Sequence, residues 1–235
     1  MLAPVATILL VDDDALLVHS VSFLLRQEGY RVVPAASAAE ALAAAQAAAP
    51  DVVLLDVALP DLSGVEVCRR LRQQTCVPII ILSARRAEAD KIVGLDAGAD
   101  DYVTKPIGAG ELAARVRAAL RRGRRAAGPE PARERLVAGE VVVDVAAHRV
   151  YVRGREIALS PREFALLHLL VAHAGRTLER QFIFEQVWGP HFYGDQSALD
   201  VYIRQLRRKI EQDPARPVLV ETVRGVGYRF AAAPP

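Results

Sequence analysis

The sequence predicts two domains in tandem: an α/β domain with a doubly wound, parallel, five-stranded sheet, followed by a smaller α+β domain. Two observations lead to this expectation. In the first half, short apolar runs alternate five times with segments of helical spacing, which is typical of a parallel sheet covered on both faces. In the second half, short strands precede three helices and a closing hairpin. At 235 residues the chain is long enough for both domains.

The first half carries five strand signals and five helix signals. The strands are expected at residues 7–11, 31–34, 52–55, 78–82 and 101–103, with 31–34 at an edge of the sheet. The helices are expected at 16–28, 38–49, 64–73, 87–97 and 109–122. Residues 123–135, GRRAAGPEPARER, combine Gly, Pro and mixed charge without an apolar period, which indicates a linker. The domains are therefore expected at 1–122 and 136–235.

The second half begins with short strands, among them 150–152 and 157–159 on either side of Arg153-Gly154. Ser160-Pro161-Arg162-Glu163 then opens a helix, with Ser160 as its cap and Glu163 completing a capping box. Further helices are expected near 178–188 and 197–211, and the segment VLVETVRGVGYRF predicts a hairpin that turns at Arg224-Gly225. Three helices and a terminal hairpin indicate a winged helix.

Composition and charge exclude several classes of protein. No signal-peptide pattern and no apolar run of membrane-spanning length is present, so we expect a cytoplasmic protein without membrane contact. Two cysteines outside a CxxC motif are too few for a disulfide framework. The net charge is only +2, and residues 136–235 hold 13 basic and 11 acidic side chains, also +2. This mild excess permits nucleic-acid binding without requiring it.

Chemistry-bearing residues follow four of the expected strands. Asp12 and Asp13 come after the first strand, Asp56 ends the third, Ser83 follows the fourth and Lys105 follows the fifth. Ligands of doubly wound sheets bind at this edge. Three carboxylates placed together repel one another unless a cation lies among them, and Mg²⁺ prefers such oxygen ligands. Each acid alone is better explained as a helix cap or turn residue, but their joint placement favours a site for Mg²⁺ and a phosphoryl group.

The segments LLVDDD, LLDVALPDLSG, ILSA and DYVTKP together resemble the receiver domain of response regulators, which has a CheY-like fold. The resemblance covers residues 1–122. It implies that Asp56 accepts a phosphoryl group from a sensor histidine kinase. It also implies that Asp13, Asp56 and the backbone carbonyl of Ala58 hold Mg²⁺, with Asp12 assisting through water.

The same resemblance assigns roles around the pocket. Lys105 and Ser83 would contact the phosphoryl group, and Ser83 and Tyr102 would form the switch pair. Pro106 would follow a cis peptide bond. One departure is Ile107, where the family usually has Phe after Lys-Pro. A receiver catalyses only its own Mg²⁺-dependent phosphorylation and dephosphorylation, so we do not expect a conventional enzyme.

Receivers of the OmpR/PhoB subfamily dimerise through the face formed by their fourth helix, fifth strand and fifth helix. The resemblance implies three ion pairs and an apolar patch on this face: Lys91 with Glu111, Asp101 with Arg115, Asp100 with Arg122, and the patch residues Ile92, Leu95 and Ala114. The alternative is a solvated face with pairs inside one chain, and exposed pairs contribute only about 0–1 kcal/mol each.

The segment 197–211, SALDVYIRQLRRKIE, has an apolar stripe on one helical face. The opposite face carries a polar set that suits base edges, because Arg reads guanine, Gln reads adenine and an aliphatic group meets a thymine methyl. This set is Ser197, Val201, Arg204, Gln205 and Arg208. Taken alone, the same face is also typical of a solvated, arginine-rich helix.

The segments LSPREFALLHLL, VWG, LDVYIRQLRRKIE and VETVRGVGYRF resemble the winged-helix effector domain of OmpR/PhoB regulators over residues 136–230. The resemblance implies that 197–211 enters the major groove of promoter DNA and that Arg224 in the wing reaches the minor groove. In this family the loop at 189–195 contacts RNA polymerase; its aromatic residues could equally pack on their own domain. The chain is thus expected to be a transcription regulator that dimerises on phosphorylation.

Three alternatives are weaker. Phosphatases of the haloacid dehalogenase type want a second Asp two residues after the first, and that position is Ala58. A phosphate-cradling GxxxxGK[ST] loop is absent. A regulator that binds DNA without phosphorylation is disfavoured by the complete acidic pocket. An electrostatic binder indifferent to sequence is disfavoured by the low net charge.

Overall fold

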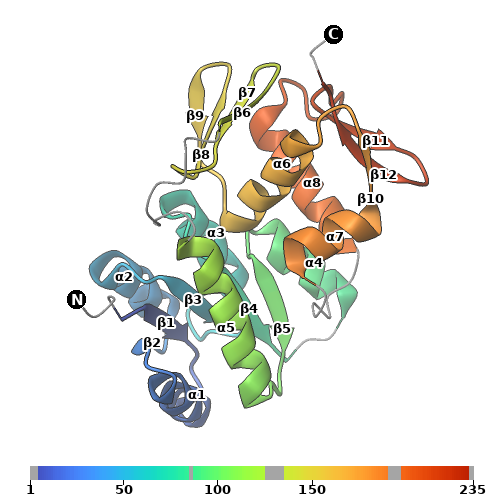
Figure 1. The fold of residues 1–235 in the computed structure, drawn as a ribbon. Coiled ribbons are helices and arrows are strands. Elements are labelled where there is room, and N and C mark those ends of the chain that lie inside the picture. Colours follow the sequence, from blue (N-terminus) through green and yellow to red (C-terminus); the bar gives the residue numbers. More distant parts are fainter. Residues whose placement is uncertain (1–4, 85–86, 125–134, 190–196, 233–235) are drawn as a thin grey trace. The chain divides into compact units, whose positions relative to one another are not determined.

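The computed structural model describes residues 5–84, 87–124, 135–189 and 197–232. The chain divides into two compact units, Met1–Arg124 and Arg125–Pro235 (Figure 1). Most of the expected linker, residues 123–135, lies outside the described residues, so the boundaries at 122 and 136 stay a prediction. Among the helices of the described ranges, none is long and apolar enough to span a membrane.

The first unit contains a five-stranded sheet in which all neighbouring strands are parallel, in the order β2-β1-β3-β4-β5. The strands are β1 (Thr7–Val11), β2 (Arg31–Ala35), β3 (Val52–Asp56), β4 (Ile79–Ser83) and β5 (Asp101–Thr104). Every residue of β1, β3 and β4 is buried, because helices cover both faces of the sheet. The predicted sheet, including β2 at its edge, is confirmed.

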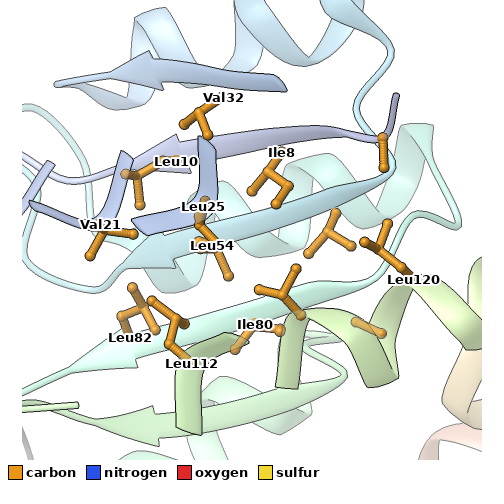
Figure 2. Close-up of a cluster of buried hydrophobic side chains, with 14 of the residues drawn as sticks. Ile8, Leu10, Val21, Leu25, Val32, Leu54, Ile80, Leu82, Leu112 and Leu120 are labelled. Carbon is orange, nitrogen blue, oxygen red and sulfur yellow. The ribbon is translucent and has the colours of Figure 1, made fainter. Parts of the chain in front are cut away.

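Five helices surround this sheet: α1 (Ala15–Gln27), α2 (Ala38–Ala48), α3 (Gly64–Gln74), α4 (Glu88–Asp96) and α5 (Ala109–Arg124). Helices α1 and α5 lie on one face, while α3 contacts both α2 and α4 on the other. Figure 2 shows the core under α1 and α5, where alternate strand residues such as Ile8, Leu10 and Leu54 meet Leu25 and Leu112. This packing holds the strand ends at fixed positions.

The second unit begins with an antiparallel sheet in the order β6-β7-β8-β9. Its strands are β6 (Arg135–Ala138), β7 (Val141–Asp144), β8 (Arg149–Val152) and β9 (Arg155–Ile157). Three helices follow: α6 (Pro161–Ala172), α7 (Arg180–Trp188) and α8 (Ser197–Ile210). A second antiparallel sheet has the order β10-β12-β11, with β10 (Thr177–Glu179), β11 (Val220–Val223) and β12 (Gly227–Phe230). The arrangement is a winged helix, as expected.

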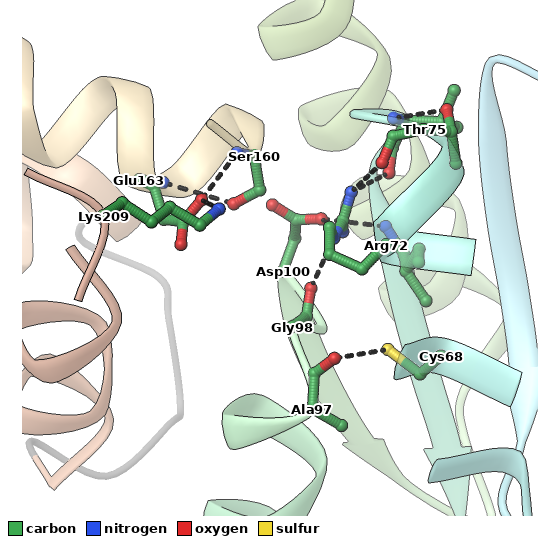
Figure 3. Close-up of polar contacts among 11 residues, drawn as sticks. Cys68, Arg72, Thr75, Ala97, Gly98, Asp100, Ser160, Glu163 and Lys209 are labelled. Carbon is green, nitrogen blue, oxygen red and sulfur yellow. Dashed lines mark hydrogen bonds and ion pairs between the residues drawn. The ribbon is translucent and has the colours of Figure 1, made fainter. Parts of the chain in front are cut away.

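Helix α6 starts at the predicted capping box, which also anchors α8 (Figure 3). The Ser160 hydroxyl accepts a hydrogen bond from the Glu163 amide (3.4 Å), and the Ser160 amide donates to the Glu163 carboxylate (2.7 Å). Lys209 of α8 donates to the same carboxylate oxygen at 2.6 Å. The expected apolar stripe of α8 is buried: Leu199, Ile203, Leu206 and Ile210 are at most 2% exposed.

Two strands differ from expectation. The strand after Arg153-Gly154 was expected at 157–159, but β9 begins at Arg155, because both turn residues have positive φ (51° and 75°) and form a two-residue hairpin turn. Strand β10 was not expected at all, since its three residues pair with β12 about fifty positions further along the chain. Gly227 permits that pairing, because a Cβ there would lie 2.0 Å from the Leu178 carbonyl oxygen.

Candidate functional site

Parallel pairing brings the predicted site residues to one edge of the first sheet. Asp12 and Asp13 directly follow β1, Asp56 is the last residue of β3, and Ser83 is the last residue of β4. Lys105 follows β5, and its amide donates to the Ser83 carbonyl at 2.7 Å. The carboxyl ends of the four strands therefore assemble the acidic pocket, which we define as Asp12, Asp13, Asp56, Ser83 and Lys105.

Lys105 lies between two of the three carboxylates. Its ammonium nitrogen is 2.6 Å from Oδ2 of Asp12 and 2.5 Å from Oδ1 of Asp56. Asp12 is 1% exposed and Asp56 4%, whereas Asp13 faces solvent. Carboxylate oxygens of the three aspartates lie within 4.8 Å of one another. The three aspartates thus offer only oxygen atoms as ligands, and the Lys105 ammonium group contacts the two buried ones.

Backbone groups fix the two buried carboxylates. Oδ1 of Asp12 accepts from the Asp14 amide at 3.0 Å, and Oδ2 of Asp56 accepts from the Ala58 amide at 2.6 Å. Gly64, the first residue of α3, lies against the Asp56 backbone, where a Cβ would be 1.9 Å from the carbonyl oxygen. Sequence reasoning missed this close approach, although a glycine eight residues after the acid is its visible signal.

Burial and the opposed charges shift two pKa values. Burial raises the pKa of Asp56 above its ordinary value, and the nearby Asp12 charge adds to this, although Lys105 and the Ala58 amide counteract it. Burial also acts to lower the pKa of Lys105, but its contacts with Asp12 and Asp56 outweigh burial and raise it. Lys105 is therefore a permanent cation at neutral pH.

The donor set fits a hard divalent cation. Mg²⁺ takes carboxylate oxygens together with water or phosphate oxygens. Asp13 makes no hydrogen bond or ion pair with any described residue, and it is the exposed member of the cluster. Receiver domains use Mg²⁺ at an acidic cluster of this kind. The Ala58 carbonyl as a further ligand stays a prediction.

The predicted switch residues lie in the core beside the pocket. Ser83 is 2% exposed and Tyr102 is 9% exposed. The Tyr102 ring lies against Gly94 of α4, where a Cβ would be 3.1 Å from its Cδ2 atom. The peptide bond between Lys105 and Pro106 is cis, as the resemblance implied.

The expected dimer face is charged, but its pairs are made inside one chain. Arg115 forms ion pairs with Asp101 (2.9 Å) and Glu111 (2.8 Å). Burial acts to lower the pKa of Arg115, but these two acids outweigh burial and raise it. Ile92 is half-buried, and the other two patch residues differ: Leu95 is buried and Ala114 is exposed. The side chains of Lys91 and Arg122 lie outside the described part of the structure.

Asp100, expected to pair with Arg122 across a dimer, is 0% exposed and accepts from Arg72 at 2.5 Å and from the Ile79 amide at 2.9 Å (Figure 3). Its pairing with Arg122 stays a prediction. Arg72 also donates to the carbonyls of Gly98 and Val77. Asp100 thus fixes the loop before β5 inside its own domain. No local signal reveals this pair, because 28 residues separate its members.

Helix α8 presents a narrower open face than expected. Arg204 and Arg208 are exposed, and Arg224 is exposed in the turn between β11 and β12. Val201 and Gln205, in contrast, are only 4% and 8% exposed. The helical wheel placed both on the open face, but it did not count Tyr202, whose ring packs edge-on against Trp188 at 5.2 Å and widens the buried arc beside them.

Two further expectations fall where nothing is described. The side chain of Ser197 lies outside the described residues, as do residues 190–196 of the expected RNA polymerase loop, including His191, Phe192 and Tyr193.

A separate network holds α8 to the hairpin: Asp200 accepts from Tyr228 and from Arg180 (2.7 Å), and Arg207 donates to the Val220 carbonyl (2.6 Å).

Comparison with known families agrees with both halves. The model of the response regulator receiver domain matches residues 8–117, and the model named "Transcriptional regulatory protein, C terminal" matches residues 154–230. Among curated proteins, the sensory transduction protein RegX3 of Mycolicibacterium smegmatis is 46% identical over 95% of this chain and 98% of its own. The DNA-binding response regulator MtrA of the same organism is 44% identical over 97% of both.

Solved structures give the same result. A mutant form of RitR aligns with a TM-score of 0.76 and 30% identity, covering 96% of this chain and 98% of the other. DrrB, an OmpR/PhoB homologue from Thermotoga maritima, aligns with a TM-score of 0.51 and 33% identity over 97% and 100%. These matches define the class, a response regulator with a DNA-binding output domain. The chain belongs to the OmpR/PhoB family, and it is a transcription regulator of a two-component system.

Proposed function

We propose that Asp56 accepts a phosphoryl group from a sensor histidine kinase and that this event activates the protein. The observation that carries the proposal is the contact of Lys105 with both Asp12 and Asp56 in a buried acidic pocket. In the proposed site Asp12, Asp13, Asp56 and the carbonyl of Ala58 hold Mg²⁺, which would neutralise charge on the phosphoryl oxygens.

The proposed reaction needs little from the protein beyond placement. An Asp56 carboxylate oxygen forms the bond to phosphorus, while the bond from phosphorus to the kinase histidine nitrogen breaks and its electron pair stays with the imidazole. Lys105 supplies a fixed positive charge for the phosphoryl oxygens, and Ser83 supplies a hydroxyl at the adjacent strand end. Loss of the phosphoryl group to water would be the receiver's other self-directed reaction.

Intact-protein mass spectrometry after incubation with Mg²⁺ and acetyl phosphate tests this proposal. We expect one phosphoryl adduct that requires Mg²⁺ and is absent from Asp56→Asn. Asp61→Asn is a matched control, because Asp61 is an exposed aspartate that caps α2 through the amides of Ala38 and Ala39. An adduct retained by Asp56→Asn, or formed equally without Mg²⁺, would contradict the assignment.

We further propose that phosphorylation promotes homodimers through the face of α4, β5 and α5. Ser83 would move toward the phosphoryl group and Tyr102 would fill the vacated space, changing the balance between two states of this face. Asp101, Glu111 and Arg115 would then exchange their pairs within the chain for pairs across the dimer, with Lys91 and Arg122 contributing and with Ile92, Leu95 and Ala114 between them. Such pairs set register and partner choice more than affinity.

A complementation experiment distinguishes pairs between chains from pairs within one chain. In a symmetric dimer, Asp101→Arg and Arg115→Asp each place like charges opposite each other, so each phosphorylated variant alone should sediment as a monomer. A mixture of the two restores opposite charges at both contacts of a mixed dimer, so dimers should return. If both variants dimerise alone, or if the mixture stays monomeric, the face is not the dimer interface.

The second unit would bind promoter DNA through exposed arginines. We place the contacts on Arg204 and Arg208 of α8 and on Arg224 of the wing; Val201 and Gln205 would reach bases only if they became exposed. Arg204→Ala should weaken specific binding by about 1–3 kcal/mol, while Arg216→Ala, an exposed loop arginine, should not. Equal affinities would refute the assignment.

We also propose that the loop at 189–195 contacts RNA polymerase. The protein would act in the cytoplasm, where promoter DNA lies.

A further inference from the structure

Helix α4 contains a buried glycine, Gly94, in its last turn. Glycine is the poorest helix former apart from proline. The backbone gives no reason for it, because the φ angle of Gly94 is not in the left-handed region. Gly98 is the glycine with a positive φ (102°) here, and it lies beyond the end of the helix at Asp96. The glycine at position 94 therefore needs an explanation other than backbone conformation.

The space around Gly94 supplies this explanation. A Cβ there would lie 3.0 Å from Cδ1 of Ile81 and 3.1 Å from Cδ2 of Tyr102. Both distances are shorter than the contacts of about 3.5–4.0 Å that carbon atoms prefer. Ile81 and Tyr102 are paired neighbours in β4 and β5, so α4 lies directly on these two strands at Gly94. A side chain at position 94 would push the Tyr102 ring or the helix away.

This contact involves the residue proposed above as the moving ring of the switch. Tyr102 is 9% exposed, so its ring takes a buried position in this structure. Ser83, the other switch residue, lies two positions after Ile81 in β4. In the proposed switch, phosphorylation favours the buried position of Tyr102. A side chain that crowds this position therefore opposes the switch, although it is not part of the acidic pocket.

We propose that Gly94 is a positioning residue of this switch, because its missing side chain leaves the room that the buried Tyr102 ring needs. The inference rests on the switch and the dimer proposed above. Alanine at position 94 shifts the balance toward an exposed Tyr102 ring, so phosphorylation of Asp56 promotes dimers less effectively. Gly94 acts through Tyr102 and takes no part in the transfer of the phosphoryl group.

Gly94→Ala in the full-length protein, treated with Mg²⁺ and acetyl phosphate, tests the proposal. Intact mass should show the same phosphoryl adduct as in the unsubstituted protein, which establishes that the variant folds and that its acidic pocket works. Sedimentation should give a dissociation constant of the phosphorylated dimer about tenfold higher, since an added methyl group crowds the packed state. An unchanged dissociation constant would overturn the proposal.

A second substitution separates crowding from helix propensity, because alanine also favours helix more than glycine does. Ile81→Val removes the Cδ1 atom nearest to position 94, so it should restore most of the dimerisation of Gly94→Ala. Ile80→Val is the matched control. It removes the same group from the same strand, but the Ile80 side chain lies in the core under α1 and α5, on the other face of the sheet (Figure 2). Equal dimerisation of the two double variants would overturn the proposal.

The ring resonances of isotope-labelled tyrosine report the position of Tyr102 directly, and loss of a signal in Tyr102→Phe identifies it. With or without acetyl phosphate, Gly94→Ala should move this signal toward the chemical shift of free tyrosine. The same signal in Gly94→Ala and in the unsubstituted protein would overturn the proposal. This measurement keeps the role of Gly94 separate from the proposed function, because an unsubstituted protein that forms no adduct or no dimer contradicts the role of Asp56 or of the dimer face instead.

Discussion

At the scale of single residues, the acidic pocket is governed by its charge balance. Three ionised carboxylates and one lysine give a formal charge of −3 + 1 = −2 within a few ångströms. Two of the acids are buried, where water screens their repulsion poorly. Lys105 offsets part of this repulsion, and a divalent cation would offset the remainder. Lys105 and a bound metal would therefore stabilise the same cluster and partly substitute for each other.

Replacing Lys105 tests this balance. Lys105→Met should lower the free energy of unfolding in metal-free buffer by about 3–5 kcal/mol, because it leaves two buried acids without their cation. Mg²⁺ should then stabilise the variant more than it stabilises the unsubstituted protein. Circular dichroism during thermal unfolding measures both effects, with Arg117→Met as a control that removes only an exposed pair with Glu28. Equal stabilisation by Mg²⁺ in both proteins would contradict the shared role.

His148 in the second unit responds to acid for a different reason. Its ring stacks on Phe164 at 3.5 Å between centroids, and burial, followed by the nearby His168, lowers its pKa from 6.5 to about 4. The unfolded chain therefore takes up this proton at a higher pH than the folded chain does. The stability contributed by neutral His148 is fully present above about pH 6.5 and is lost as the pH falls toward 4.

The corresponding variant is His148→Asn, since Asn tolerates the positive φ of 53° at this position. Between pH 7 and pH 4 the unsubstituted protein should lose roughly 1–2 kcal/mol more stability than the variant, a value reduced for partial exposure of the ring. Fluorescence of Trp188, the single tryptophan, reports unfolding of this unit. Parallel pH profiles for the two proteins would show that His148 does not titrate in this way.

The pocket residues were predictable because each follows a strand whose apolar run is visible in the sequence, and parallel pairing leaves one place where they can meet. The Arg72–Asp100 pair was not predictable, because its members come together only after α3 and β4 are in place. The burial of Val201 and Gln205 was missed for a related reason. A helical wheel considers the residues of one helix only, whereas Trp188, which packs against α8, belongs to α7.

At the scale of elements, the junction between β3 and α3 sets the position of Asp56. The Gly64 amide donates to the Val57 carbonyl at 2.9 Å, and its Cα packs directly on the Asp56 backbone. A side chain at residue 64 would force the strand end and the helix apart. The geometry of the acidic pocket thus depends on a residue that carries no charge.

Gly64→Ala should therefore destabilise the first unit by about 1–3 kcal/mol and slow formation of the phosphoryl adduct. Gly110→Ala is the matched control, because a Cβ at this α5 position meets nothing within 4 Å and alanine favours helix. Thermal unfolding and the time course of the intact mass measure the two effects. If a destabilised Gly64→Ala protein forms the adduct at the normal rate, the geometry of the acidic pocket does not depend on this junction.

Element boundaries were predictable where local chemistry sets them, as at the Ser160 cap of α6. They were not where distant pairing sets them. Strand β10 exists because Gly227 lets β12 approach Leu178, and three residues give no pattern of their own. The start of β9 depended on the backbone conformation of Arg153 and Gly154 rather than on the apolar residues that follow them.

At the scale of the whole molecule, we propose that phosphorylation of the first unit controls DNA binding by the second. The fold of each unit could be predicted from its own half of the sequence. The match to a RegX3 protein extends over 95% of the chain and so includes both units. A receiver dimer would raise the effective concentration of two DNA-binding domains over adjacent half-sites. We therefore expect paired half-sites, arranged as direct repeats, in the DNA that the phosphorylated protein protects.

The most direct test is selection of fragments from the genome that encodes this chain, with and without Mg²⁺ and acetyl phosphate, followed by sequencing. Phosphorylated protein should enrich a discrete set of fragments that contain paired half-sites. The same concentration of untreated protein, or of Asp56→Asn treated with the donor, should not. Equal enrichment of the same fragments by all three samples would contradict control through Asp56 and favour a regulator that binds DNA without phosphorylation.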